Sequence, residues 1–199
     1  RAPHQLRGAL RLLGDGDECF RRLDHGMLSK DGWIRVLDAS RDDVLAHLER
    51  TFSTLVAMGW TYQKLDFLYT QAMQADAADP AVSRAGRLRR GLEAVRRGCG
   101  DAAFLLGCGC PLGPAIGVVD GMRVGPDVAP SWHLDLPLVL PGLTGTQPST
   151  RNGVRNVLAR AWMHRRYWLA DPDCLMTRER DTKLTPDEAR TLGAVMAAT

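Results

Sequence analysis

The alternation of strand-like and helix-like segments is the feature that most constrains the fold of this chain. From residue 32 onward, short apolar runs with strand character are followed by longer stretches with apolar residues at helical spacing. The expected order is strand, helix, strand, helix, strand, strand, helix, strand and helix. Repeated β–α units of this kind predict an α/β fold, with a parallel sheet covered by helices. An open doubly wound sheet and a (β/α)8 barrel both fit this order.

The segment boundaries follow from capping residues and from glycine or proline punctuation. Strands are expected at 33–37, 61–66, 103–106, 118–124 and 167–169, and helices from Ser40, Ser83, Asn152 and Thr185. The stretches 40–43 and 185–188 read as capping boxes. Residues 1–31 are expected to be irregular and are unassigned, whereas 32–199 form one catalytic domain. Because a complete barrel needs about 250 residues, four or five strands indicate part of a barrel.

Composition excludes several classes of protein. The 199 residues are 45% apolar and 25% charged, as in a soluble globular protein, and contain no apolar run long enough to span a membrane. The net charge of +3 is too balanced to indicate a nucleic-acid partner. Five cysteines, an odd number, fit no zinc spacing and favour free thiols in a reducing compartment. No signal-peptide pattern is present, which favours a cytoplasmic location.

Polar residues at the expected strand ends are the candidates for chemistry, since function gathers there in parallel α/β folds. The strand at 61–66 ends with Lys64 and Asp66. Side chains alternate along a strand, so these two are expected on the same face, pointing into one cavity, with Leu65 on the other. Charged groups are costly to bury unless they are paired or hydrated. A purely structural buried ion pair is the alternative interpretation.

The next two strand ends add further candidates. The glycine-rich run 107–110 would let the backbone approach a ligand, although a plain tight turn explains it equally well. Cys108 in this run is otherwise a small core residue. The following segment brings Asp120, Arg123 and Asp127, with Pro126 stiffening the chain before the last carboxylate. A salt bridge from Arg123 to a nearby aspartate is the structural alternative.

Two carboxylates at the ends of neighbouring strands are the minimum set for glycoside hydrolysis. One must be ionised to attack the anomeric carbon, and the other must hold a proton for the leaving oxygen. Lys64 beside Asp66 favours the ionised form, as a nucleophile requires. Paired aspartates also serve phosphatases, magnesium sites and isomerases, so the residue pattern by itself leaves these reactions open.

Four blocks resemble the α-galactosidases of glycoside hydrolase family 36, in the right order along the chain. They are Lys64-Leu65-Asp66-Phe67-Leu68-Tyr69, Leu106-Gly107-Cys108-Gly109-Cys110-Pro111-Leu112, Val119-Asp120-Gly121-Met122-Arg123-Val124-Gly125-Pro126-Asp127 and Trp168-Leu169-Ala170-Asp171-Pro172-Asp173-Cys174-Leu175. The resemblance covers roughly residues 32–195. It implies a (β/α)8 barrel, of which this chain carries about the C-terminal half, and a reaction that releases terminal α-galactose with retention.

The resemblance also implies roles for individual residues. Asp66 would be the nucleophile and Asp127 the acid/base. Lys64 would hydrogen-bond the hydroxyl groups of galactose, while Cys108 and Arg123 would lie near its 2-hydroxyl side. Neither a metal nor an organic cofactor is implied. The substrate would be a galactoside oligosaccharide of the raffinose or melibiose type, and the implied partners include no nucleic acid and no membrane.

The sequence departs from the family in two respects. Ala170 stands where asparagine is usual, and the early barrel strands that grip galactose O4 and O6, together with the N-terminal β-sandwich, have no counterpart here. The chain therefore resembles a fragment or a truncated gene product. Two alternatives stay open. One is a non-catalytic half barrel that binds sugar or pairs with another chain, including a homo-oligomer, and the other is a related enzyme such as an α-N-acetylgalactosaminidase.

Overall fold

The computed structural model describes residues 20–23, 34–73, 77–133 and 147–198. The chain divides into two compact units, which are treated separately below. Unit 1 comprises Arg1–Leu105 and Cys110–Val119, and unit 2 comprises Leu106–Gly109 and Asp120–Thr199. In the described part, helices and strands alternate from residue 34 to the last helix; the sequence predicted this alternation except between 103–106 and 118–124, where it expected two successive strands.

Unit 1 begins with a two-stranded antiparallel sheet. β1 (Phe20–Leu23) pairs with β2 (Ile34–Leu37), with Phe20 opposite Leu37. The strand at 34–37 was expected as the first parallel strand, and it is instead a member of this separate sheet. The expectation of an irregular segment 1–31 is likewise wrong for residues 20–23, which form β1. The sequence did not indicate this strand, because its pairing partner lies ten residues further along and the residues between carry no repeating pattern.

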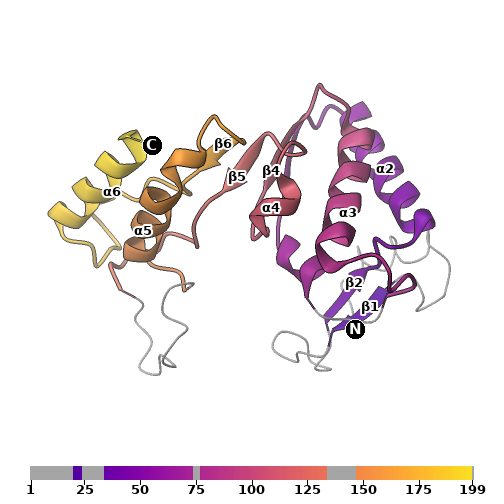
Figure 1. Ribbon diagram of the computed structural model, residues 1–199. Helices are drawn as coiled ribbons and strands as arrows, with labels where there is room; N and C mark the ends of the chain where they lie inside the picture. The colour runs from indigo at the N-terminus through magenta and orange to yellow at the C-terminus, as the bar shows by residue number, and fades with distance from the viewer. Residues whose placement is uncertain (1–19, 24–33, 74–76, 134–146, 199) are drawn as a thin grey trace. The chain divides into compact units, whose positions relative to one another are not determined.

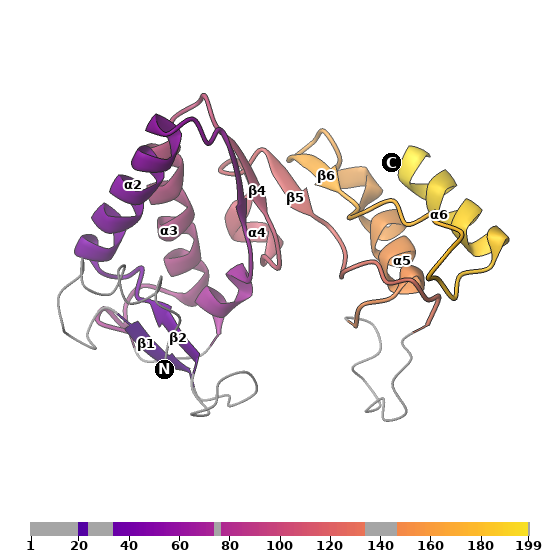
Figure 2. The same ribbon diagram turned by 180° about the vertical axis from the view of Figure 1, so that it is seen from behind.

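Two long helices form the helical layer of unit 1. α2 (Asp42–Ala57) and α3 (Arg84–Cys99) lie side by side in both views of the chain (Figures 1 and 2). Their inward faces carry the predicted apolar stripes, and Val44, Leu88 and Leu92 are almost fully buried. Gly98 allows close approach, because a Cβ atom there would lie 3.0 Å from the Cα and carbonyl carbon of Glu49.

The two predicted helix starts of unit 1 have different outcomes. Ser83 caps α3 as predicted, since its hydroxyl oxygen accepts a hydrogen bond from the Gly86 amide at 3.1 Å. Ser40 does not cap α2, whose N-cap is Arg41 without a side-chain bond. The Ser40 hydroxyl donates instead to the buried Asp38 carboxylate at 2.8 Å. The second Asp38 oxygen accepts from the Ala78 amide at 2.7 Å, which ties the end of β2 to a loop forty residues later.

The main sheet has the strand order β3-β4-β5-β6. In unit 1, β3 (Tyr62–Leu65) lies next to β4 (Phe104–Gly107), with the Phe104 amide donating to the Thr61 carbonyl at 2.7 Å. The end of β4 belongs to unit 2, where it pairs in parallel with β5 (Gly121–Arg123). β5 pairs in parallel with β6 (Leu169–Asp171), which places Arg123 opposite Asp171.

Unit 2 is completed by two further helices. α5 (Thr150–Arg160) starts at the Ser149 cap, and α6 (Pro186–Ala198) packs on it through a small core of Val128, Val154 and Leu192. The predicted capping box at α6 is confirmed, because the Thr185 amide donates to the Glu188 carboxylate at 2.8 Å and the Glu188 amide donates to the Thr185 hydroxyl at 3.3 Å.

The shorter elements are three helical turns. These are η2 (Leu68–Ala72), α4 (Leu112–Ala115) and η3 (Ala161–Met163). α4 was not expected, and the helix expected from Asn152 ends at Arg160 and continues only as the short turn η3. The α/β class, with a parallel sheet and accompanying helices, is confirmed. The share of a complete barrel that this chain carries stays a prediction.

Candidate functional site

The end of β3 holds the first pair of predicted residues. Lys64 and Asp66 lie on the same face, as strand alternation predicts, and the Lys64 Nζ is 3.3 Å from the Asp66 Oδ2. Gln63 on the opposite face is buried, whereas Tyr62 on the Lys64 face is 60% exposed. Both charged side chains are 41% exposed, so the pair is hydrated and is not the buried ion pair considered as an alternative. The lysine therefore places a positive charge next to one carboxylate oxygen of Asp66.

The second oxygen of Asp66 is also held. The Phe67 amide donates to the Asp66 Oδ1 at 2.7 Å, with Phe67 in the left-handed region at φ 55°. A bulky residue rarely adopts this conformation, which costs on the order of 1–3 kcal/mol. The strain places the amide where it fixes the carboxylate. One oxygen of Asp66 is thus oriented by a backbone donor and the other by a cation.

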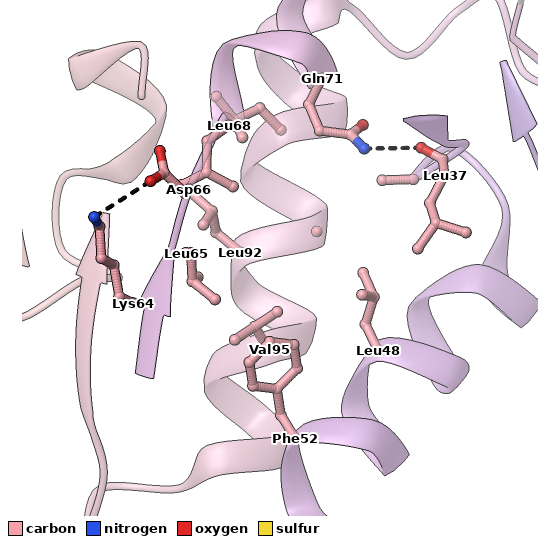
Figure 3. Close-up of a pocket in the computed structure, with 13 residues that line it drawn as sticks. Leu37, Leu48, Phe52, Lys64, Leu65, Asp66, Leu68, Gln71, Leu92 and Val95 are labelled. Atoms are coloured by element: carbon pink, nitrogen blue, oxygen red, sulfur yellow. Dashed lines mark hydrogen bonds and ion pairs between the residues drawn. The ribbon is translucent and has the colours of Figure 1, made fainter. Parts of the chain in front are cut away.

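A cavity of about 310 Å³ in unit 1 reaches this pair (Figure 3). Its walls are mostly hydrocarbon, from the helix faces of α2 and α3 and from Leu65 and Leu68. Polar side chains are contributed by Lys64, Asp66 and Gln71, and Gln71 is occupied by its hydrogen bond to the Leu37 carbonyl at 2.9 Å. Because apolar walls offer no hydrogen bonds to a polar ligand, the charged groups of this cavity lie at the Lys64–Asp66 edge.

Arg123 is the centre of a second cluster, in unit 2. Its side chain is only 10% exposed, and each of its three nitrogens faces a different carboxylate. Nε donates to Asp171 at 2.9 Å, Nη2 lies 3.0 Å from Asp173, and Nη1 donates to Asp127 at 3.3 Å. The salt bridge considered as the alternative role of Arg123 is therefore present, and it involves three acids.

The three carboxylates of this cluster differ in how firmly they are held. Asp173, at φ 79°, accepts the Val128 amide at 2.7 Å, and its own amide donates to Asp171 at 2.9 Å. The Asp127 side chain pairs with Arg123 and is 73% exposed. Burial of the Arg123 guanidinium works against its charge, but the hydrogen bond to Asp171 and the charges of Asp171 and Asp173 outweigh this and raise the pKa of Arg123.

Two cysteines border the arginine cluster. Cys108 follows β4 and is buried, next to the pairing of Gly107 with Met122 on the strand of Arg123, and it contributes to the raised pKa of Arg123. The next residue, Gly109, has φ 54°, a conformation that glycine adopts freely, so the turn at 107–110 requires it. Burial, followed by the charge of Asp173, raises the pKa of the Cys174 thiol and keeps it protonated at neutral pH.

The structure thus gathers the predicted residues into one group in each unit. Lys64 and Asp66 meet in unit 1, whereas Cys108, Arg123 and Asp127 lie together in unit 2. Asp171 and Asp173 belong to the second group and were not predicted. The parallel pairing of β5 with β6 is the signal that could have indicated Asp171, because it makes Asp171 the cross-strand partner of Arg123. Among the described residues, no group of three or more His, Cys, Asp or Glu side chains could hold a metal ion.

A parallel sheet with helices, whose strand ends carry acidic and basic side chains, defines an α/β protein of the kind that includes the barrel glycosidases. The chain is similar to TtGalA, the α-galactosidase from Thermus thermophilus. Against its structure in complex with stachyose, the identity is 31% over 86% of this chain, with a TM-score of 0.69. Against its complex with p-nitrophenyl α-D-galactopyranoside, the values are 33%, 84% and 0.68.

This similarity confirms the resemblance to the α-galactosidases of glycoside hydrolase family 36 that the four sequence blocks indicated. No protein-family model matches the sequence. The chain spans 38% and 33% of the two solved chains, which is roughly a third of their length. Within the described residues, no helix is both long and apolar enough to cross a membrane.

Proposed function

We propose that this chain carries the reaction centre of a retaining α-galactosidase, which releases terminal α-D-galactose from galactosides of the raffinose or melibiose type. The observation that carries the proposal is the oriented carboxylate at the end of β3, where Asp66 is bound by Lys64 and by the Phe67 amide. Similarity to an α-galactosidase solved with stachyose supports the choice of substrate.

The proposed reaction has two displacements. In the first, an Asp66 oxygen attacks the anomeric carbon, the glycosidic bond breaks, and Asp127 gives its proton to the leaving oxygen. In the second, Asp127 takes a proton from water, the water oxygen attacks the anomeric carbon, and the bond to Asp66 breaks. Asp127 suits proton exchange with an incoming or departing molecule, since its side chain is 73% exposed.

The sugar would be held by the groups beside these acids. Lys64 has three N–H donors, so it can keep its contact with Asp66 and still donate to galactose hydroxyls. Cys108 and Arg123 would border the 2-hydroxyl side. Cys108 and Arg123 at this position would favour a plain 2-hydroxyl, as in galactose, over a bulky 2-substituent.

Replacement of the nucleophile tests this function. Asp66→Ala should abolish release of an aryl α-galactoside, and added azide should restore turnover by taking the place of the missing carboxylate. The matched control is Asp101→Ala, an exposed acid in the turn after α3, which should leave activity unchanged. A wild-type chain that cleaves no α-galactoside would refute the proposal for this chain, and loss of activity without rescue would remove Asp66 from its role.

A second candidate is a half barrel that needs another chain. It is favoured by the exposed aromatic residues around β3, with Trp60 at 61% and Tyr62 at 60% exposure, since such residues are usually covered. Addition of a polypeptide that supplies the remaining strands should then produce activity that neither chain has by itself. The alternative of an α-N-acetylgalactosaminidase is tested by comparing two substrates. Such an enzyme should cleave an aryl α-N-acetylgalactosaminide faster than the corresponding aryl α-galactoside.

A further inference from the structure

The two carboxylates that sequence reasoning missed are turned toward the same guanidinium as the proposed acid/base. We propose that Asp171 and Asp173 are positioning residues, which fix Arg123 so that its remaining nitrogen holds Asp127 in place. This inference rests on the proposed role of Asp127. It assigns to Arg123 a task inside the protein, in addition to any contact with the sugar.

The first contact is built into the sheet. Arg123 and Asp171 are cross-strand partners in the parallel pairing of β5 and β6, so their side chains leave the sheet next to each other. The Nε of Arg123 donates to Asp171 Oδ2 at 2.9 Å, while Asp171 Oδ1 accepts the amide of Asp173. Both oxygens of Asp171 are therefore used, which leaves this side chain little freedom to turn.

The second contact comes from the chain just beyond β6. Asp173 takes a positive φ of 79°, and its Oδ2 accepts the Val128 amide at 2.7 Å. Its Oδ1 is 3.0 Å from the Nη2 of Arg123, and its side chain is only 14% exposed. A charge-assisted contact in such a shielded place is stronger than one in water.

Two fixed nitrogens determine the position of the third. A guanidinium is planar, so once Nε and Nη2 are held by Asp171 and Asp173, the direction of Nη1 is set. That nitrogen donates to Asp127 at 3.3 Å. Asp127 is the exposed member of the cluster, and an exposed ion pair by itself orients a side chain only weakly. The orientation of Asp127 therefore depends on acids that contact the arginine from its buried side.

The charge balance of the cluster fits the same role. A general acid must carry a proton before it can donate one, and an uncompensated arginine beside Asp127 would oppose this. Asp171 and Asp173 place two negative charges beside the guanidinium, and the titratable groups near it also include Asp127 and the thiols of Cys108 and Cys174. Arg123 can then orient Asp127 without imposing a full positive charge on it.

Chemical labelling of Arg123 tests the arrangement without any catalytic readout. Phenylglyoxal modification, mapped by mass spectrometry, should be at least about tenfold faster in Asp171→Asn/Asp173→Asn than in wild type, because two charge-assisted bonds are lost. The matched control Glu179→Gln removes an exposed charge of the same unit and should leave the rate unchanged. Asp127→Asn should raise it by less than about threefold, since that contact is exposed.

Equal labelling of the double variant and wild type would overturn the proposal, and so would an equal increase in Asp127→Asn. Arg160, which donates to the Val124 carbonyl, serves as the internal reference for an intact fold. If the double variant also exposes Arg160, the labelling rates of the two single variants are compared instead, because each of them leaves the other carboxylate in place.

Leaving-group dependence tests the link to the acid/base. A sugar leaving group needs a proton from Asp127, whereas dinitrophenol departs without one. The single variants Asp171→Asn and Asp173→Asn should lower kcat for a raffinose-type substrate about tenfold or more, and for the dinitrophenyl galactoside less than about twofold. Equal losses on both substrates would overturn the positioning role. A wild-type chain that cleaves neither substrate contradicts the proposed function, while the labelling result still decides whether Asp171 and Asp173 hold Arg123.

Discussion

Close packing of α2 on α3 leads to a prediction in which the usual effect of a substitution is reversed. Glycine inside a helix normally costs about 1 kcal/mol relative to alanine, so Gly→Ala stabilises. At Gly98, however, a Cβ would lie 3.0 Å from two backbone carbons of Glu49 and closer still to its carbonyl oxygen. Ordinary carbon contacts are about 3.5–4.0 Å, so the helices would have to separate by roughly 0.5–1 Å.

The size of the effect follows from these distances. Overpacking costs about 1–3 kcal/mol, and the upper end applies because the obstacle is backbone, which cannot rotate away. Subtraction of the helix-propensity gain leaves a net loss of about 2 kcal/mol for Gly98→Ala. For a chain of this length, that loss lowers Tm by about 4–8 °C.

Gly91 in the same helix is the matched control. A Cβ at Gly91 would lie 3.5 Å from the Ala39 Cβ and 4.0 Å from Leu48, which is ordinary contact. Gly91→Ala should therefore raise the stability by up to about 1 kcal/mol. Thermal and urea unfolding followed by far-UV circular dichroism would measure both variants. The packing argument is refuted if Gly98→Ala unfolds at or above the wild-type Tm, or if Gly91→Ala loses as much stability as Gly98→Ala.

Two further predictions concern pH and catalytic geometry. Burial and the neighbouring charge of Arg50 lower the pKa of His47 below its usual 6.5, so the folded state binds a proton less readily than the unfolded one. Unfolding free energy should therefore fall as the pH drops below about 6.5, and His47→Gln should reduce that dependence; an unchanged pH profile in the variant would contradict it. In a crystal structure with a galactoside bound, the carboxyl groups of Asp66 and Asp127 should lie about 5–5.5 Å apart, and a separation beyond about 6.5 Å would exclude retention.

The parts of the fold that the sequence predicted correctly are those governed by near neighbours. Ser83 and Thr185 cap helices because the groups they bond lie three residues away, within reach of any local pattern. Ser40 lies in an equally suitable sequence but does not cap α2, because Asp38 two residues earlier competes for its hydroxyl group. The pairing of β1 with β2 was likewise beyond local reasoning, since strand pairing is decided by partners distant in the chain.

The candidate site shows the same division. Lys64 and Asp66 are two residues apart on one strand, so alternation alone predicts that they meet. The partners of Arg123 lie 48 and 50 positions later, and only the register of β5 against β6 brings Asp171 to it. Reasoning from each strand end separately allowed a salt bridge from Arg123 to a nearby aspartate, but it could not identify Asp171 and Asp173 as the acids that bind it.

The buried carboxylate of Asp38 also bears on how quickly this unit folds. Its bond to the Ala78 amide, together with the bond from the Asp79 amide to Ser40, closes a loop of about forty residues that contains β3. Closing such a loop costs conformational entropy before any contact across it is gained. Helices α2 and α3 are built from contacts between near neighbours and can form on the submicrosecond-to-microsecond scale of isolated helices. We therefore expect β3, which Asp66 directly follows, to reach its final environment late, in a step whose rate is governed by long-range closure.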